Sequence, residues 1–237
     1  MDGFVDIHHH LLYGLDDGPA AFHQMAGMLR AAHEDGIAAI IATPHAAPGF
    51  RPFDGALAER RVREARAYCK KNALPLEIYL GAEVLVTPKF FAEPLTSIPT
   101  LAGSRYVLVA FAPDADDVLA ERAIRSLMHC GRVPVVAHVE RCRFLTARPE
   151  RLFRLKGLGA LFQVNCAALL DGGWLNLGWL IREGLIDFAA TDAHDTMRER
   201  RMTRAHRILE RIAGSGCARE LTSANARERL LPGTVLI

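Results

Sequence analysis

The sequence predicts an α/β fold in which parallel strands alternate with helices and close into a barrel. First, seven short apolar runs alternate with segments of helical periodicity over the 237 residues, as in proteins built around a buried parallel sheet. Second, histidine and carboxylate side chains follow most of these runs, as they do at the C-terminal face of a (β/α)8 barrel. With seven runs, this barrel would have one β/α unit fewer than eight. An open doubly wound sheet is the competing arrangement, but no G-x-G-x-x-G follows the first run.

The predicted strands are continuous apolar runs bounded by turn residues, which is the pattern of strands buried on both faces. They cover residues 4–8, 37–42, 76–80, 106–111, 133–137, 160–164 and 186–190. No run approaches the roughly 18 apolar residues of a membrane span, so we expect no transmembrane segment.

Amphipathic segments between the runs predict helices. The first covers residues 20–35, with Pro19 at its start and Gly36 after its end. The last covers residues 224–231, and we expect Ser223 to be its N-cap. The others cover residues 56–72, 117–130, 149–156, 174–183 and 198–213.

The composition is that of one soluble globular domain over residues 1–237. Hydrophobic residues make up 50% and charged residues 24%, which allows a sizeable core and excludes a disordered chain. The net charge of +2 argues against dedicated nucleic-acid binding. The five cysteines include no C-x-x-C pair, and the N-terminus has no signal-peptide pattern. We therefore expect a cytoplasmic protein with free thiols.

Half of the 10 histidines lie beside carboxylates at the ends of predicted strands. Histidine, aspartate and glutamate bind divalent cations such as Mn, Fe and Zn. Residues two apart on a strand face the same way, so the paired ligands after the first and last strands can point at one centre. The pattern predicts a multinuclear metal centre, and its candidate ligands are His8, His10, Asp17, His45, Glu83, His138, Asp192 and His194.

Each candidate also has a structural interpretation when taken alone. Asp17 could be an N-cap before Pro19, Glu83 a surface charge, and His138 a hydrogen-bonded core histidine. Their joint placement at strand ends favours metal binding. The remaining histidines are predicted to be structural, namely His9, His23, His33, His129 and His206.

Nine short motifs carry a resemblance to a known superfamily. They are DIHHH at 6–10, LDDGP at 15–19, TPH at 43–45, GAE at 81–83, PTL at 99–101, SRY at 104–106, AHVER at 137–141, QVN at 163–165 and DAH at 192–194. Their order resembles the PHP (polymerase and histidinol phosphatase) superfamily. Within it, the chain resembles the bacterial capsule and exopolysaccharide tyrosine phosphatases, and LDDGP and H-x-E-R are the most specific motifs.

The resemblance implies a distorted (β/α)7 TIM-like barrel of PHP type, with up to three divalent ions. Manganese is the expected metal, with Fe, Zn, Co and Mg as alternatives. It further implies that Arg141 contacts the substrate phosphate, and that the substrate is the phosphotyrosine-bearing tail of a bacterial tyrosine kinase. By position, His8, His10, Glu83 and Asp192 would hold the first ion, Glu83 with His138 the second, and Asp17, His45 and His194 the third.

The sequence departs from this family pattern at two places. An acidic ligand of the second ion is expected at the end of the fourth strand, where Ala110 stands and offers no donor atom. The second ion would then be weakened, unless Asp114 or Asp116 reaches in from the following loop. After the DAH motif, the family's arginine corresponds to Arg198 or Arg200, which the sequence does not distinguish.

The leading prediction is a metal-dependent phosphohydrolase that acts on phosphotyrosine. Clustered divalent ions acidify a bound water and neutralise a transferring phosphoryl group, and an arginine adds a bidentate phosphate contact. The alternatives are a PHP enzyme for a small phosphomonoester or phosphodiester, and a weakly active or non-catalytic metal-binding barrel because of Ala110. Residues 142–148 fit the C-x5-R spacing of cysteine-dependent phosphatases, but they lack the small residues of a phosphate-binding loop.

Overall fold

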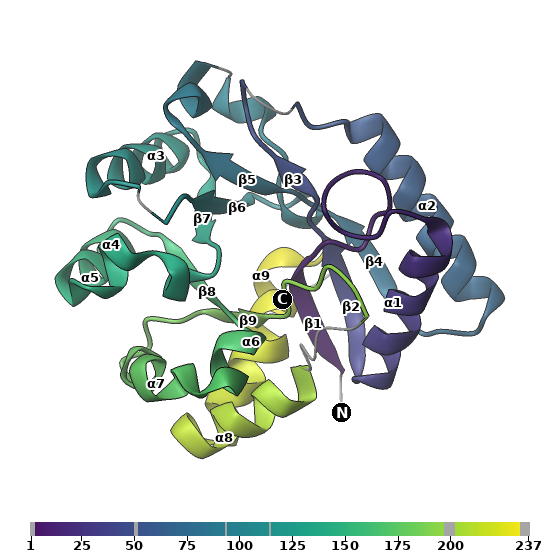
Figure 1. Ribbon diagram of the computed structural model, residues 1–237. Coiled ribbons are helices and arrows are strands. Elements are labelled where there is room, and N and C mark those ends of the chain that lie inside the picture. Colours follow the sequence, from purple (N-terminus) through teal and green to yellow (C-terminus); the bar gives the residue numbers. More distant parts are fainter. Residues whose placement is uncertain (1–2, 50–51, 93, 114, 197–201, 233–237) are drawn as a thin grey trace.

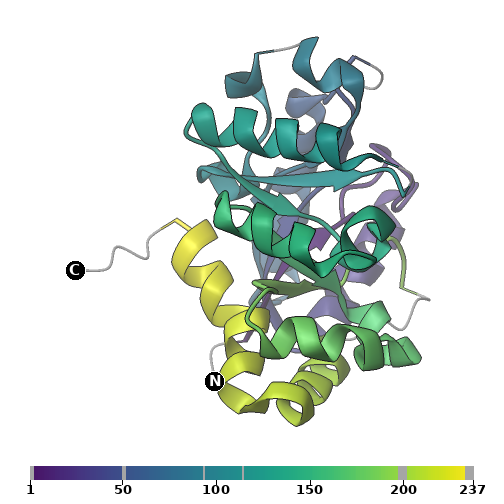
Figure 2. The ribbon, with the colours of Figure 1, turned by 90° about the vertical axis from the view of Figure 1, so that its left-hand side faces the viewer.

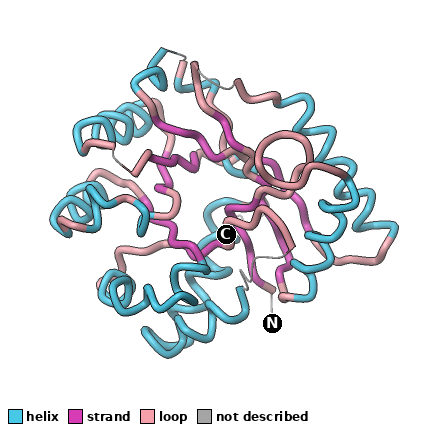
Figure 3. The backbone as a smooth tube through the Cα atoms, viewed as in Figure 1, coloured by secondary structure: helices cyan, strands magenta, loops and turns pink. Residues whose placement is uncertain are grey.

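The computed structural model describes residues 3–49, 52–92, 94–113, 115–196 and 202–232, to which all structural statements below refer. These residues form an α/β fold in which parallel strands lie inside a ring of helices (Figure 1). Figure 3 shows the same arrangement, with the strands at the centre and the helices around them. No described helix has the length and apolar character needed to cross a membrane.

The strands form two curled parallel sheets, ordered β1-β2-β4 and β3-β5-β6-β7-β8-β9. Central strands with apolar side chains on both faces account for the continuous runs of the sequence. Their bounds are β1 Phe4–His9, β2 Ile37–Ala42, β3 His45–Ala46, β4 Glu77–Leu80, β5 Glu83–Val86, β6 Tyr106–Phe111, β7 Val133–Val136, β8 Leu161–Asn165 and β9 Phe188–Ala190.

The two sheets are connected where β3 and β5 follow directly after β2 and β4. The sequence analysis did not predict these two short strands, because each is separated from the preceding run by only two residues. In the second sheet His45 pairs with Glu83, so two candidate ligands lie side by side. The register of β5 and β6 pairs Glu83 with Leu108 and Leu85 with Ala110.

Strands β9 and β1 approach each other at their C-terminal ends. The backbone N–H of Asp192 donates to the carbonyl of His8 (2.8 Å), and the N–H of His10 donates to the carbonyl of Ala193 (2.9 Å). The carboxylate of Asp6 accepts a further bond from the N–H of Thr191 (3.0 Å). These contacts bring the first and last motifs of the chain together.

Helices cover the outer faces of the sheets. Figure 2 shows α9 on the side of the molecule where the N-terminus lies, and Ser223, just before α9, donates its hydroxyl to the carbonyl of Gly3. The bounds are α1 Phe22–Glu34, α2 Gly55–Lys71, α3 Asp117–His129, α4 Arg143–Thr146, α5 Pro149–Gly157, α6 Cys166–Ala168, α7 Trp174–Arg182, α8 Met202–Arg219 and α9 Asn225–Leu230.

The core has two parts. The larger cluster lies between the strands and the helices, and it includes Met25 and Leu29 from α1 and Ile124 and Leu127 from α3. The smaller cluster gathers side chains from both sheets, from β1 and β2 of the first and from β6, β7 and β9 of the second. Because strands of both sheets contribute to this cluster, the sheets must curl around it. The inner faces of the sheets are therefore buried, like the outer faces under the helices.

Several predicted element boundaries were wrong. Pro19 does not begin α1: Ala21 is its N-cap, and the Gln24 side chain accepts the N–H groups of Ala20 and Ala21. Ser223 is not an N-cap, because residues 220–224 form a wide helical turn that runs into α9. Helix α8 continues past residue 213 to Arg219 through a kink at Gly214.

Candidate metal centre

The structure brings the eight predicted ligands together at one edge of the sheets, at or after the C-terminal ends of β1, β2, β4, β7 and β9. His8 lies on β1 and His10 directly after it, while Asp17 comes from the loop that follows. The remaining five come from β3, β5 and the segments after β7 and β9, and they are His45, Glu83, His138, Asp192 and His194. Two groups among these residues have donor atoms within 4.8 Å of one another, His8–His10–Glu83 and His10–Asp17–His45–His194.

The first group is deeply buried and has the spacing of a cation site. The Nε2 atoms of His8 and His10 are 3.2 Å apart, and each lies 3.3 Å from Glu83 Oε2 and 3.4 Å from Asp192 Oδ1. Four donors around a first-row divalent cation with bonds of about 2.1 Å have tetrahedral edges of about 3.4 Å. The three edges among His8, His10 and Glu83 therefore fit one cation, while Asp192 reaches both imidazoles but lies outside this group of donors.

Hydrogen bonds on the far side of both rings support the same assignment. His8 Nδ1 lies 3.1 Å from Gln163 Oε1, and His10 Nδ1 lies 2.7 Å from Asp16 Oδ2. These oxygens accept, so each Nδ1 carries a proton, and Nε2 is the atom of each ring that would bind a cation. Both Nε2 atoms also face the carboxylates of Glu83 and Asp192, so a bound cation would take the place of any proton that they carry.

The electrostatics of Glu83 point the same way. Burial disfavours its charged form, but His8, His10 and His138 outweigh burial and hold the pKa of the carboxyl well below its ordinary range. The same balance of burial against His8 and His10 lowers the pKa of Asp192. Both candidate ligands are thus anionic at neutral pH.

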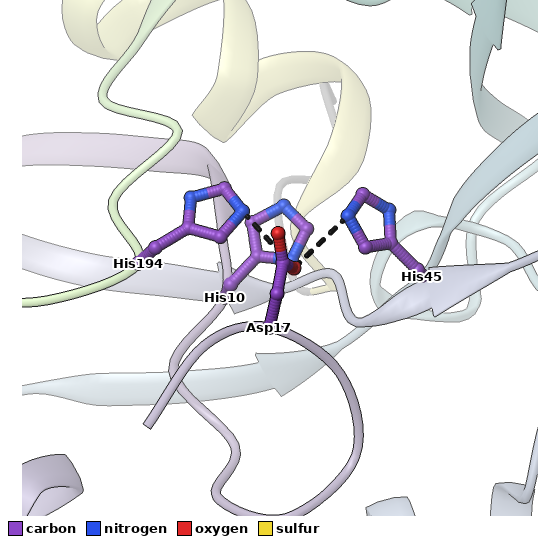
Figure 4. Close-up of side chains that lie close together, drawn as sticks. All are labelled: His10, Asp17, His45 and His194. Carbon is purple, nitrogen blue, oxygen red and sulfur yellow. Dashed lines mark ion pairs between the residues drawn. The ribbon is translucent and has the colours of Figure 1, made fainter. Parts of the chain in front are cut away.

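The second group is more open to solvent. Asp17 Oδ1 lies 3.2 Å from His45 Nε2 and 3.4 Å from His194 Nε2, with the Asp17 side chain between the two rings (Figure 4). The Asp17 side chain is 69% exposed, and its loop lies over the strand ends. Asp17 is therefore not an N-cap, and an exposed carboxylate between two imidazoles is suited to a cation that substrate can reach.

The neighbourhood of His138 holds fewer donors. His138 Nε2 lies 2.8 Å from Glu83 Oε1, the oxygen that faces away from the first group. Ala110 contributes no donor, and Asp116 instead caps α3 by accepting the N–H of Leu119. Asp114 lies outside the described residues. The described part of the chain thus offers two donors at this place.

Asp16 is a further candidate residue of this site, and sequence reasoning missed it. Its carboxylate accepts from His10 Nδ1 and from the backbone N–H of His45 (3.0 Å) and Gly18 (3.0 Å). Burial alone would raise the pKa of Asp16, but the bond to His10 and the other donors lower it to about 2. The DD pair of LDDGP was the available signal, but the sequence could not tell which carboxylate faces the ions and which supports a ligand.

Two candidate ligands have left-handed backbone conformations. The φ angle is 52° at Asp192 and 32° at His138, although neither residue is glycine. Such conformations are unfavourable by roughly 1–3 kcal/mol and persist only where surrounding contacts enforce them. Their occurrence at the ends of β9 and β7 is typical of a functional site.

Arg141 lies at the edge of the first group. Its Nη2 atom is 3.1 Å from Asp192 Oδ2, and its side chain is 53% exposed. One end of the guanidinium is thus anchored at the centre while the rest stays accessible to an anion from solvent. Arg198 and Arg200 lie outside the described residues.

Glu140 gives a pH-dependent stability prediction. Burial, the largest effect, raises the pKa of this carboxyl from its ordinary 4.5 to about 7. Because the pKa of Glu140 is higher in the folded state than in the unfolded state, its contribution to folding stability is fully present below pH 4.5. This contribution is lost as the pH rises through 7. We expect Glu140→Gln to raise the free energy of unfolding at pH 8 by about 1–3 kcal/mol and to change it little at pH 5. Denaturant unfolding in chelator measures both values.

The matched control for this experiment is Glu150→Gln, which alters an exposed glutamate at the start of α5. It should leave stability unchanged at both pH values. An equal effect of Glu140→Gln at pH 5 and pH 8 would contradict the burial argument.

The C-x5-R segment does not form a nucleophilic site. The side chain of Cys142 is fully buried, and burial raises the pKa of its thiol to about 12. Residues 143–146 form α4 rather than a phosphate-binding loop. A protonated, inaccessible thiol cannot attack a phosphoryl group.

The five other histidines lie outside both ligand groups. His9 is buried on β1, and burial lowers its pKa to about 3, so its ring is neutral. His206 Nδ1 bonds to Thr222 Oγ1 (2.9 Å) in the C-terminal region. His23 and His33 lie on α1, and His129 ends α3.

Comparison with known proteins identifies relatives along the whole fold. The family model described as "Capsular polysaccharide synthesis, CpsB/CapC" matches residues 4–231. The tyrosine-protein phosphatase YwqE of Bacillus subtilis is 30% identical over 217 residues, which cover 89% of this chain and 85% of that protein. The tyrosine-protein phosphatase CpsB of Streptococcus agalactiae is 25% identical over 237 residues, which cover 95% of this chain and 98% of that protein.

A solved structure has the same architecture. It belongs to work on YwqE from Bacillus subtilis and CpsB from Streptococcus pneumoniae, described as unique metal-dependent tyrosine phosphatases. The superposition gives a TM-score of 0.85 with 29% sequence identity, and it covers 98% of this chain and 96% of that chain.

Proposed function

Because this chain belongs to the CpsB/CapC family of capsular polysaccharide synthesis, we propose that it is a metal-dependent tyrosine-protein phosphatase. The observation that carries the proposal is the set of eight candidate ligands at one edge of the sheets, with Arg141 beside them. Relatives with the same fold are named tyrosine-protein phosphatases, and the fold-matched pair is described as metal-dependent.

The ligand assignment follows the grouping of donor atoms. His8, His10 and Glu83, with Asp192 beside the two imidazoles, would hold one cation, and Asp17, His45 and His194 would hold another. Glu83 Oε2 lies 2.9 Å from His45 Nδ1, between the two groups. Imidazole and carboxylate donors suit Mn, Fe, Zn or Co, with Mg less favoured by so many nitrogens. We take manganese as the working metal.

Divalent ions held at these residues would supply an acidified water and positive charge beside the phosphoryl oxygens. The protein's own residues arrange the rest. Asp16 and Gln163 keep the protons of His10 and His8 on Nδ1, so that Nε2 remains a donor. Arg141, anchored by Asp192, places its guanidinium where it binds the equatorial phosphate oxygens. A tyrosyl leaving group, with a pKa of about 10, requires less protonation than an alkoxide.

The function is tested with a phosphotyrosyl peptide and purified protein. Hydrolysis should require added Mn²⁺ and stop when a chelator is present. Sugar, nucleotide and histidinol phosphates under the same conditions test the alternative of a small phosphoester. Full activity in chelator-stripped protein would refute the proposal. A preference for a small phosphoester would show that the substrate is of that class and not a phosphotyrosyl protein.

Two ions per chain, rather than three, is the proposed stoichiometry. Ala110 shares a face with Glu83, because Glu83 pairs with Leu108 and residues two apart on a strand face the same way. We expect Ala110→Glu to add a third ion beside His138 and Glu83, with a severalfold change in turnover. Elemental analysis of dialysed protein measures the count.

Ala110→Gln is the matched control for this stoichiometry, since an amide has similar size but is a weaker ligand. It should remain at two ions per chain. Three ions in the wild-type protein would show that another side chain completes the second site.

The remaining proposals concern architecture and setting. Strands β2 with β3 and β4 with β5 act as single bent strands, and the β1–β9 contact then closes a distorted (β/α)7 barrel that forms one domain over residues 1–237. The substrate is the phosphotyrosine-bearing tail of a bacterial tyrosine kinase, and the protein acts in the cytoplasm. Free cysteines support that compartment.

A further inference from the structure

Strand β8 supplies none of the candidate ligands, yet two amide side chains at its C-terminal end lie among them. Gln163 and Asn165 are 0% and 2% exposed. A buried amide is strongly unfavourable unless its polar atoms are hydrogen-bonded. The partners of these two amides therefore indicate why they occupy the inner end of β8.

The oxygen of Gln163 contacts two ligand residues. Gln163 Oε1 accepts the backbone N–H of His138 (2.9 Å) and lies 3.1 Å from His8 Nδ1. A backbone N–H can only donate, which identifies this atom as the oxygen. His8 Nδ1 must then be the protonated nitrogen, so His8 Nε2 is free to coordinate.

The nitrogen of Gln163 continues the chain of bonds. Gln163 Nε2 donates to Asn165 Oδ1 (2.8 Å), and Asn165 Nδ2 donates to Asp192 Oδ2 (2.8 Å). With Oδ2 engaged in this way, Asp192 presents Oδ1 to His8 and His10. Each amide is fixed by its neighbour, so neither can rotate without breaking a bond to a ligand.

We propose that Gln163 and Asn165 are positioning residues that set three ligands at once: the tautomer of His8, the carboxylate of Asp192 and the backbone of His138. The inference rests on the metal centre of the proposed function. Both Asp192 and His138 have left-handed backbone conformations that need such support. Hydrogen bonds behind metal ligands typically contribute 10–100-fold to metal affinity or activity.

The test titrates Co²⁺ into chelator-stripped, full-length protein and follows the visible d–d absorption of the bound ion. Gln163→Met keeps the side-chain length and removes both polar atoms. The expected result is a 10–100-fold weaker Co²⁺ affinity and an altered absorption band. Hydrolysis of a phosphotyrosyl peptide, measured in parallel with saturating Co²⁺, should also decrease.

The matched control is Thr222→Val, which removes a buried hydroxyl that bonds to the carbonyl of Ala218 and to His206, away from the metal centre. It should lower the thermal stability without changing Co²⁺ affinity or the spectrum. Asn165→Ser, a milder change that no longer reaches Asp192, serves as the second variant if Gln163→Met does not fold.

Unchanged Co²⁺ affinity and spectrum in a folded variant of either residue would overturn the proposed positioning role. Failure of the underlying function looks different, because wild-type protein itself would then bind no Co²⁺ or hydrolyse no phosphotyrosine. A loss of Co²⁺ affinity in Thr222→Val equal to that in Gln163→Met would also count against the proposal, since any buried defect would then produce it.

Discussion

Glu83→Gln is expected to abolish phosphatase activity, with a decrease of about 10³-fold or more, and to lower the content of bound metal. Glu83 Oε2 faces His8, His10 and His45, while Oε1 faces His138, so one carboxylate serves every ligand group. The amide has the same shape but carries no charge and is a poor ligand. Without the ions the attacking water keeps a pKa near 15.7 rather than about 7, which accounts for the size of the loss.

Turnover of a phosphotyrosyl peptide and elemental analysis measure the two effects together. Asp187→Asn is the matched control, because Asp187 is also a buried carboxylate but bonds to Lys156 and to the N–H of Phe162. It should reduce stability without reducing metal per folded chain. A Glu83→Gln protein that keeps all its metal would contradict the central place of this carboxylate.

The strands could be predicted from the sequence, and the candidate ligands could be identified in it, because both are local signals. An apolar run such as residues 106–111 forms β6 with the predicted bounds, since burial on both faces leaves no polar side chain within it. His45 and Glu83 were identified from their positions after apolar runs, and the parallel pairing of β3 with β5 brings them together. In such cases the sequence pattern and the tertiary structure agree.

Supporting residues could not be predicted in the same way, because their roles depend on contacts between distant segments. Gln163 meets His8 across 155 residues of sequence, and the QVN motif that contains it does not show that its side chain is the partner of a candidate ligand. Asp16 and Asp17 are adjacent and chemically equal, and only the folded loop turns one toward His10 and the other toward His45. Helix ends were also misplaced where a side chain such as Gln24, rather than the expected Pro19, satisfies the first N–H groups.

Arg141→Ala is expected to lower kcat for a phosphotyrosyl peptide by about 10²–10³-fold while bound metal stays unchanged. The half-exposed guanidinium touches the centre only through Asp192 Oδ2, which also accepts from Asn165 Nδ2 and so stays in place without the arginine. The expected decrease in kcat therefore comes from weaker phosphate binding in the transition state and not from the loss of a metal ligand. Steady-state kinetics and elemental analysis of the same preparation measure the two quantities.

Two further variants separate charge from geometry in this prediction. Arg141→Lys keeps the positive charge but loses the planar, bidentate fork, so kcat should recover only in part. Arg143→Ala removes an exposed arginine two residues further on, in α4, and should leave kcat unchanged. Release of metal by Arg141→Ala would contradict this prediction. It would mean that the arginine holds the Asp192 carboxylate in place for the ion instead of binding the phosphate.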